Sequence, residues 1–384
     1  MSSPDIFYYN MTVGNLDPSK VETYNGDGVK AEIEAYNNLP IVDNVDDYYC
    51  SIIRFSIPAF NLPLINFLVQ TPVKDINLGV YSFTIGDGTN FGEQNFVIYE
   101  PQQIQPPWDT PKPNTLTQTF GNYYFCYDYT WFIMMLNKAL ANAVASYNTK
   151  FTKTESVPFF NYDASTQLIS LYTTVSGNWE RNSATPVYIY FNNALSNYMT
   201  GLPYNTSRQF TTGYTPTDIG CDNLINIDIN NGLNVVTIPA YGGGEDTQYI
   251  KTTYQYNAYG YWSFLKSLLI TTNMNVEAEA FFLNDPSGKQ NVKYTNVLTD
   301  FQPDFSVANG AGISAQILNY DAPSLYRIFQ FKQKTPLYKI SLNINYTDTY
   351  GNIYPLYLDI GQQANFKLMF IKKTLYKQNN FLLN

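Results

Sequence analysis

The sequence predicts an all-β protein, and two observations support this prediction. Most of the chain consists of short alternating or apolar runs separated by clusters of Gly, Pro, Asn and Asp, which is the pattern of strands joined by turns. Only one stretch, Tyr129–Ser146, has the spacing of a long helix. Many short strands with turn signals between them are typical of β-sandwiches, barrels and jelly rolls.

The expected strands form three groups along the chain. Three precede the middle region, at least five follow it, and the others lie between. In order they are Ile6–Val13, Val29–Asn37, Tyr48–Ile57, Gly79–Ile85, Asn95–Tyr99, Leu168–Val175, Val187–Phe191, Leu224–Ile229, Val235–Ile238, Tyr249–Tyr256, Leu265–Thr272, Val276–Phe282, Val292–Thr299, Tyr326–Phe331, Leu337–Tyr346, Ile353–Leu358 and Phe366–Lys373.

The segment Tyr129–Ser146 is expected to be an amphipathic helix. Its apolar residues recur at the spacing of one helical face, whereas Asn137, Lys138 and Asn142 fall on the other face. Packing of the apolar face on a sheet is the commoner use of such a stripe, and docking in a partner's groove is the alternative. The apolar face consists of Phe132, Met135, Leu136, Ala139, Leu140, Ala143 and Val144.

The middle of the chain, roughly Leu64 to Tyr259, differs from both ends. Besides the helix it contains the proline-rich stretch Gln102–Asn114, which cannot hydrogen-bond as an interior strand and is expected to be an extended connector. Further irregular zones lie at Thr200–Asn223 and Tyr241–Thr247.

Composition narrows the function classes. Aromatic residues make up 17% of the chain and charged residues 14%, against about 25% charged residues in an average soluble domain. The formal charge is 22 − 31 = −9, and no basic tract exceeds Lys372-Lys373. A nucleic-acid backbone would be repelled by such a chain, so we expect no direct nucleic-acid binding.

Histidine is absent from all 384 residues. This absence removes the commonest general base near neutral pH, the Ser-His-Asp and Cys-His systems, and nearly all catalytic zinc sites. Cys50, Cys126 and Cys221 are odd in number and scattered, unlike a disulfide framework or a metal-binding pair. We expect reduced thiols, no metal, no cofactor and no enzyme activity.

No targeting or membrane segment is expected. The N-terminus lacks a basic region followed by an apolar one, as a signal peptide would have. The longest apolar stretch, Trp131–Ala145, is interrupted by Asn137 and Lys138 and falls short of the roughly 20 residues that span a bilayer.

Carboxylates are the remaining candidates for acid and base chemistry. Glu32/Glu34 and Glu277/Glu279 each lie two residues apart in strand-like runs, so each pair is expected on one face of a strand. Two such pairs could flank a glycosidic bond. The favoured interpretation is the polar face of a half-buried strand.

Four loop-like motifs also have simple explanations. Val42–Asp47 and Asn226–Asn230 could supply oxygen ligands to calcium, but neither has the ligand spacing of an EF-hand. The glycine-rich Gly86–Gly92 and Tyr241–Thr247 lack the Gly-Lys-Ser/Thr ending of a phosphate loop. We interpret these motifs as turns, strand faces or hairpin tips, and we expect no catalytic, cofactor-binding or metal-binding residue.

Asparagine and tyrosine motifs leave alternatives open. The Asn-X-Ser/Thr matches are interpreted as accidental in a chain so rich in Asn and Thr. Clustered tyrosines could stack sugar rings, or they could serve buried interfaces, which is the favoured alternative. The matches begin at Asn10, Asn205 and Asn345, and the tyrosines are Tyr254, Tyr256, Tyr259 and Tyr261.

Several stretches carry a family resemblance through their order and joint occurrence. They are YYCSIIRFSIP at Tyr48–Pro58, SLLITTNM at Ser267–Met274, NVLTDFQPDFS within Asn291–Ser306, and PLYKISLNINYTDTYGNIYPLYLDIG at Pro336–Gly361 followed by FKLMFIKK. In them the chain resembles the penton, or minor capsid, proteins of virophages and Polinton-like viruses, of the Sputnik virophage type. The motifs cover roughly Asp5–Pro58 and Tyr261–Lys373.

The resemblance implies a single eight-stranded antiparallel jelly roll, made of two facing four-stranded sheets and interrupted by a mostly β insertion domain that carries the helix. The jelly-roll capsid domain is expected to comprise residues 1–63 and 260–384, and the inserted outer domain residues 64–259. The strand list fits independently, because three expected strands precede the middle region and at least five follow it.

The resemblance further implies a structural protein that forms homopentamers at the fivefold vertices of an icosahedral virion and contacts the major capsid protein. Its expected location is the virion, after synthesis in the host cytoplasm or viral factory. Interfaces favour aromatic residues and disfavour dense like charge, which suits this composition. The terminal segments Met1–Pro4 and Gln378–Asn384 are expected to be mobile arms.

The alternative is a carbohydrate-binding β-sandwich that attaches to glycans of a host or giant-virus surface. The late stretch TYGNIYPLYL at Thr349–Leu358 bears on this choice, because it could be an aromatic binding surface. Its position between two expected strands favours a hairpin at one end of the roll, with tyrosines used for packing and assembly.

Overall fold

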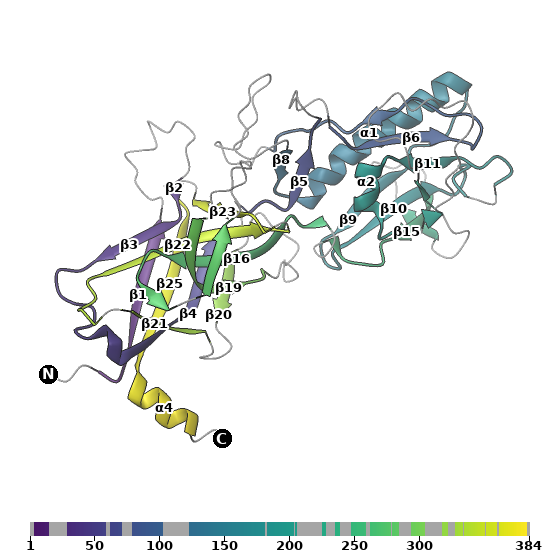
Figure 1. Cartoon of the computed structure of the whole chain (residues 1–384). Helices are drawn as coiled ribbons and strands as arrows, with labels where there is room; N and C mark the ends of the chain where they lie inside the picture. Colours follow the sequence, from purple (N-terminus) through teal and green to yellow (C-terminus); the bar gives the residue numbers. More distant parts are fainter. Residues whose placement is uncertain are drawn as a thin grey trace.

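The computed structural model describes most of the chain. Its described residues are 4–14, 29–58, 62–70, 79–102, 123–180, 183–202, 204–205, 225–227, 235–238, 247–258, 262–277, 279–283, 293–303, 317–321, 327–332, 334–349, 351–358 and 361–381. They form an elongated molecule with two lobes, which we call the roll and the second lobe (Figure 1).

The roll is built from two antiparallel sheets, A and C, that contain only strands from the two ends of the chain. Sheet A comprises β1 (Ile6–Gly14), β25 (Gln363–Lys372), β4 (Tyr48–Pro58), β21 (Ile328–Phe331), β17 (Val276–Glu277) and β20 (Ile317–Asp321). Sheet C comprises β18 (Glu279–Leu283), β19 (Lys293–Phe301), β16 (Leu265–Thr272), β22 (Lys339–Asp348), β23 (Ile353–Pro355) and β3 (Glu32–Tyr36), and β2 (Val29–Lys30) pairs with β24 (Tyr357–Leu358) nearby.

The strand order is that of a jelly roll. Sheet A runs β1-β25-β4 and continues with β20 and β21, which pair with successive parts of one edge of β4. Sheet C runs from β3 through β22 and β16 to β19. Successive long strands mostly alternate between the sheets, which is the double Greek-key pattern. The predicted all-β jelly roll is therefore confirmed.

The number of strands in each sheet differs from the expected four. Each sheet has six assigned strands in the described part of the chain. The extra strands are short pieces: β17 belongs to sheet A and β18 to sheet C, and β23 extends the edge of β22 beyond β3. They arise where the chain bends from one sheet to the other or doubles back, which periodicity alone does not reveal.

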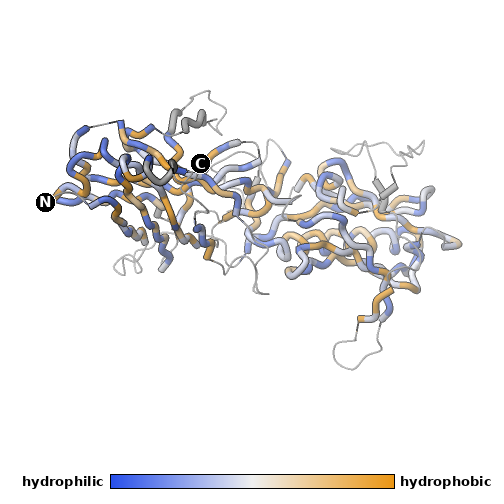
Figure 2. The backbone as a smooth tube through the Cα atoms, turned by 90° about the horizontal axis from the view of Figure 1, so that it is seen from below, coloured by the Kyte–Doolittle hydropathy of each residue, from blue (hydrophilic) through white to orange (hydrophobic). Residues whose placement is uncertain are grey.

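The core of the roll lies between the two sheets. Met11, Phe55 and Phe366 point inward from sheet A, and Leu342 and Ile344 point inward from sheet C, all at most 6% exposed. Residues between them point outward, because side chains alternate along a strand. Figure 2 shows this alternation of apolar and polar residues along the backbone.

In the described residues, the second lobe contains three small sheets and two helices. The strands are β5 (Ile65–Leu68) with β8 (Tyr123–Cys126); β14 (Val235–Ile238), β15 (Thr247–Thr253), β10 (Leu168–Thr174) and β9 (Phe159–Asp163); and β12 (Tyr204–Asn205), β13 (Ile225–Ile227), β11 (Tyr188–Phe191), β6 (Ser82–Gly86) and β7 (Asn95–Phe96). The helices are α1 (Tyr129–Phe151) and α2 (Asn193–Met199).

Helix α1 confirms the predicted amphipathic helix and extends beyond it to Phe151. The Asp128 side chain accepts a hydrogen bond from Thr130 N at 2.7 Å and so caps the first turn. All seven residues of the predicted apolar face are buried. On the polar face, Asn137 donates to Phe160 O at 2.9 Å and accepts from Phe160 N at 2.8 Å. This amide thus hydrogen-bonds the backbone N–H and C=O of Phe160 on the outer edge of β9, which would otherwise be open to pairing with another strand.

Some elements were not predicted. The strands β5, β8, β9, β12 and β20 and the helices α2 and α4 (Lys373–Phe381) have no counterpart in the expected list. Residues 378–381, expected within a mobile arm, are helical as part of α4. The proline-rich stretch Gln102–Asn114 lies almost wholly outside the described residues.

The roll and the second lobe meet where the chain passes between them. Phe264 N donates to Leu64 O at 2.7 Å, and Leu64 N donates to the carbonyl of Cys126 at 2.9 Å. The ring of Phe264 lies 5.4 Å from that of Phe125 in the second lobe and 5.8 Å from that of Tyr354 in the roll. One buried aromatic residue therefore touches both lobes.

The stretch Thr349–Leu358 forms part of this junction. Tyr346 on β22 pairs with Tyr354 on β23, and their rings are stacked at 5.2 Å. Asp348 closes the turn, because its carboxylate accepts hydrogen bonds from Asn352 N at 2.8 Å and from the Tyr354 hydroxyl at 3.0 Å. Gly351 supplies the positive φ of 83° that the turn requires. The hairpin is confirmed, and Tyr354, 1% exposed, is used for packing within the chain.

Helix α4 continues from β25 and contacts the roll through Lys373 and Tyr376. Lys373 Nζ donates to an Asp46 carboxylate oxygen at 3.0 Å, and the ring of Tyr376 lies edge-on to Tyr49 at 5.1 Å. The hydrogen bond and the positive charge of Lys373 lower the pKa of Asp46 below its ordinary value of 3.8.

Replacing Phe264 by Ala is expected to lower the free energy of unfolding by about 3–5 kcal/mol, because it leaves a cavity where the two lobes meet. Chemical denaturation monitored by near-ultraviolet circular dichroism measures this change. Tyr256→Ala, at a side chain that is 52% exposed, is the control and should change stability by about 0.5 kcal/mol or less. Equal effects of the two substitutions would contradict the role of Phe264.

Asp46→Asn is expected to lower the Tm in a pH-dependent way. The ionised carboxylate stabilises the fold above its ordinary pKa, and this contribution is lost as the pH falls through the lowered pKa. The Tm difference from the wild type should be constant above about pH 5 and vanish toward pH 2. Asp43→Asn, at an exposed residue of the same loop, should show no such difference; a Tm loss in D46N that persists at low pH would contradict the assignment.

Candidate functional site

The predicted acidic pairs do not form a catalytic arrangement. Glu32 and Glu34 both point outward from β3, and Glu34 Oε1 lies 2.7 Å from Lys339 Nζ. Glu277 hydrogen-bonds to Gln330 across sheet A, whereas Glu279 begins β18 in sheet C. The expectation that Glu277 and Glu279 share one face of one strand is therefore wrong, because the chain changes sheets between them.

The motifs that were weighed as calcium or phosphate loops, and interpreted as turns, strand faces or hairpin tips, are either paired within the chain or lie outside the described residues. In Val42–Asp47, Asp46 is paired with Lys373. Only the first two residues of Asn226–Asn230 are described, in β13, and only Thr247 of Tyr241–Thr247, at the start of β15. Over the described ranges, no three His, Cys, Asp or Glu side chains come together as metal ligands would.

The Gly86–Gly92 loop is a closed turn. Asp87 Oδ1 accepts from Thr89 N at 3.0 Å and from Asn90 N at 2.7 Å, and the Tyr147 hydroxyl donates to Asp87 Oδ2 at 3.2 Å. Burial opposes ionisation of Asp87, but these hydrogen bonds outweigh it and lower the pKa of Asp87. The amides that a phosphate would need are already taken by a side-chain carboxylate.

The tyrosine cluster does not form a sugar-stacking surface where it is described. Tyr254 is 3% exposed, with its hydroxyl donating to Tyr198 O, and burial raises the pKa of Tyr254. Tyr256 is 52% exposed, and residues 259–261 lie outside the description. Tyr254 therefore serves packing within the chain, and the use of this cluster at an interface stays a prediction.

The three asparagines of the Asn-X-Ser/Thr matches lie on strands. Asn10 is exposed on β1, Asn345 donates to Thr271 Oγ1 at 2.9 Å on the outer side of sheet C, and Asn205 lies in β12.

Cys50 is a free thiol, and its burial raises its pKa. Cys126 is fully buried and Cys221 lies outside the described residues. In the ranges that can be described, none of the helices combines the length and hydropathy needed to cross a membrane.

Sequence reasoning missed two surfaces of the roll that the strand registers bring together. The first is the outer side of sheet A, which we call the cationic face. Arg54 on β4 is the cross-strand neighbour of Lys367 on β25, and Lys367 in turn is the neighbour of Asn10 on β1. The Lys367 ammonium lies 4.6 Å from the ring centre of Tyr8, which is 52% exposed.

Uncharged polar groups border these two cations. Thr12, Asn365, Ser56 and Asn319 form the next row across β1, β25, β4 and β20. Together with Asn10 and Arg54 they line a shallow pocket of about 410 Å³. The cationic face is thus two adjacent positive charges bordered by amides and hydroxyls, with Asp321 on β20 beside Arg54.

The second surface lies at the free edge of sheet C, and we call it the β3 corner. It consists of Glu32, Glu34 and Tyr36 on β3, with Leu39 and Tyr338 beside them. Tyr36 and Leu39 are 71% and 73% exposed, and Tyr338 is 39% exposed. Large apolar side chains with this exposure, next to carboxylates, are typical of an interaction surface.

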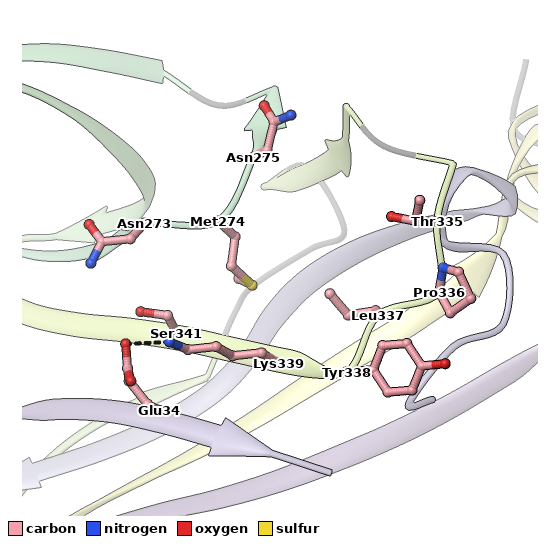
Figure 3. Close-up of a pocket in the computed structure, with 10 residues that line it drawn as sticks. All are labelled: Glu34, Asn273, Met274, Asn275, Thr335, Pro336, Leu337, Tyr338, Lys339 and Ser341. Atoms are coloured by element: carbon pink, nitrogen blue, oxygen red, sulfur yellow. Dashed lines mark ion pairs between the residues drawn. The ribbon is translucent and has the colours of Figure 1, made fainter. Parts of the chain in front are cut away.

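A pocket of about 400 Å³ opens beside the β3 corner (Figure 3). It forms because β22 continues past the last residue of β16 that pairs with it: Thr271 faces Asn343, and after Thr272 the chain turns away through Asn273 to Asn275. In Figure 3 the side chains of Met274 and Leu337 point into the space, and the Glu34–Lys339 ion pair lies at one side.

Ser341 is the one lining residue with an unmet hydrogen bond. It is 4% exposed, and its Oγ has no hydrogen-bond partner among the described residues. A buried hydroxyl without a partner is destabilising by about 1–3 kcal/mol.

Comparisons with known proteins agree with this architecture. The chain is 37% identical over 147 residues to the uncharacterized protein V18 of Sputnik virophage, covering 36% of this chain and 83% of V18. It is 28% identical over 222 residues to the structural protein V19 of Sputnik virophage, covering 57% of this chain and 95% of V19.

Two solved structures are similar over nearly the whole chain. A chain of the Sputnik virophage structure determined by cryo-EM matches with a TM-score of 0.75 and 27% identity, covering 97% of this chain and 99% of that one. The mavirus penton protein matches with a TM-score of 0.61 and 13% identity, covering 96% and 100%, which shows a shared fold.

The family model of the Sputnik minor capsid protein V18/19 matches residues 7–372. This range contains both sheets of the roll and all of the second lobe. It also contains the stretches on which the resemblance was based, except for Lys373 at the end of the last one. The chain therefore belongs to the Sputnik minor capsid protein V18/19 family, structural proteins of the virophage virion.

Proposed function

We propose that this minor capsid protein forms homopentameric pentons that close the fivefold vertices of the virion and contact the major capsid protein around them. The observation that carries the proposal is that the roll presents two unlike surfaces, the cationic face and the β3 corner. A closed ring requires one patch of a subunit to contact a different patch of its neighbour. A structural role of this kind needs no catalytic residue.

The proposal includes the division of the chain into a jelly-roll capsid domain, residues 1–63 and 260–384, and an inserted outer domain, residues 64–259. It is supported by the strand pairing, since no pair among the described strands joins one set to the other. In Figure 1 the N-terminus and α4 lie at the end of the roll far from the second lobe. We place that end against the capsid shell and the second lobe outward.

A three-dimensional map of purified virions by cryo-EM tests the assignment. The expected result is five copies of this chain around each fivefold axis, each with a density that fits the roll and the second lobe. Density at the vertices that fits another protein, or absence of this chain from purified virions by mass spectrometry, would overturn the proposal. Synthesis in the host cytoplasm or viral factory remains a prediction.

Deleting residues 378–384 is expected to reduce incorporation into particles much more than it lowers the Tm. The deletion removes only the last turn of α4 and the residues after it, and leaves the Lys373–Asp46 and Tyr376–Tyr49 contacts in place. Quantitative mass spectrometry of particles and calorimetry of the purified chain measure the two effects. Proportionate loss of both would indicate that the segment serves folding and not assembly.

A further inference from the structure

The cationic face sets two positive charges side by side on neighbouring strands. Arg54 and Lys367 are direct cross-strand neighbours, and like charges in that position are destabilising. Arg54 forms no ion pair with any described residue, although Asp321 is its neighbour on β20. In a chain of net charge −9, two adjacent cations on an open sheet face indicate an acidic partner surface.

The β3 corner has the opposite character. Glu32 and Glu34 lie on the same side of β3, and only Glu34 is in an ion pair, with Lys339, among the described residues. The Glu34 and Lys339 side chains are 61% and 48% exposed, so both remain accessible. Tyr36, Leu39 and Tyr338 add exposed apolar area beside these carboxylates.

Exposed aromatic rings lie on both surfaces. Tyr8 on the cationic face is 52% exposed, and Tyr36 on the β3 corner is 71% exposed. The cationic face also offers exposed amide and hydroxyl groups, among them Asn10 and Thr12. A contact between the two surfaces would cover both rings, and amphipathic rings of this kind are typical of interface centres.

The charge arrangement also selects the geometry of association. Two cationic faces repel each other, and two β3 corners repel each other, so a symmetric dimer through either surface is disfavoured. Only the contact between unlike surfaces brings opposite charges together. Such a heterologous contact, repeated with closure, makes a ring.

We infer that the cationic face of one copy, centred on Arg54 and Lys367, packs against the β3 corner of the next copy, centred on Glu32 and Glu34. The partner is a second copy of this chain. The inference rests on the proposed pentamer and specifies which surfaces form it.

Charge exchange in the full-length chain tests the contact. R54E/K367E and E32K/E34K each place like charges on both sides of the contact, and each is expected to weaken self-association at least about tenfold. The variant that combines all four substitutions has opposite charges on the two surfaces again. The two arginine and lysine substitutions change the formal net charge by −4 and the two glutamate substitutions by +4, so this variant keeps the net charge of −9. It should associate within about twofold of the wild type. Sedimentation velocity and native mass spectrometry measure association at low salt, and thermal unfolding verifies that each variant folds.

The matched control is K153E/K251E in the second lobe, which changes the net charge by the same −4 as R54E/K367E. It should leave association unchanged. A wild-type chain that does not associate, reversed variants that associate like the wild type, or a fourfold variant that fails to recover would each overturn the inference. Pentamers seen at virion vertices, combined with insensitivity to these reversals, would retain the proposed penton and reject only these surfaces.

Discussion

The hydrogen bond from Phe264 N to the carbonyl of Leu64 joins the two passages of the chain between the lobes. The second lobe enters after β4 and returns before β16, so its two ends lie side by side. A long insertion is tolerated when its two ends lie close together, because it then joins two neighbouring positions of the fold in the way a short loop would. The jelly roll can therefore continue from sheet A to sheet C across an insertion that holds eleven assigned strands, β5 to β15.

This junction also explains how the two lobes are coupled. Phe264 contacts Phe125 on one side and Tyr354 on the other, and Trp262 Nε1 donates to Tyr198 O of the second lobe at 2.7 Å. Thr349 N donates to Phe264 O at 3.1 Å, which ties the β22–β23 turn to the same passage. A buried aromatic cluster with its polar atoms satisfied resists deformation. The hairpin that looked like a binding surface in the sequence is thus part of the joint.

The sequence revealed elements whose pattern repeats and missed those whose pattern is too short or too polar. Helix α1 and strands β14 and β16 lie where the sequence pattern places them. Helix α1 and strand β16 have buried faces that recur along the element, and β14 is bounded by clear turn residues. Helix α4, KTLYKQNNF, has few apolar residues and contains two asparagines, so nothing in it resembles a buried helical face.

The two surfaces of the roll could not be predicted, because they depend on which strands pair and in which register. Arg54 and Lys367 are far apart in the sequence and adjacent only through β4–β25 pairing.

The unusual composition follows from how tyrosine is used. The Tyr99 hydroxyl donates to Phe125 O at 2.7 Å, and the Tyr81 hydroxyl donates to Asn66 O at 3.1 Å. Each ring adds to the core while its hydroxyl satisfies a backbone carbonyl that would otherwise be unpaired. A chain that hydrogen-bonds its buried backbone groups in this way needs few buried charges.

Three tyrosines differ from the buried ones. Tyr8, Tyr36 and Tyr338 are 52%, 71% and 39% exposed on the outside of the roll. Exposed aromatic area of this kind is typical of an interaction surface.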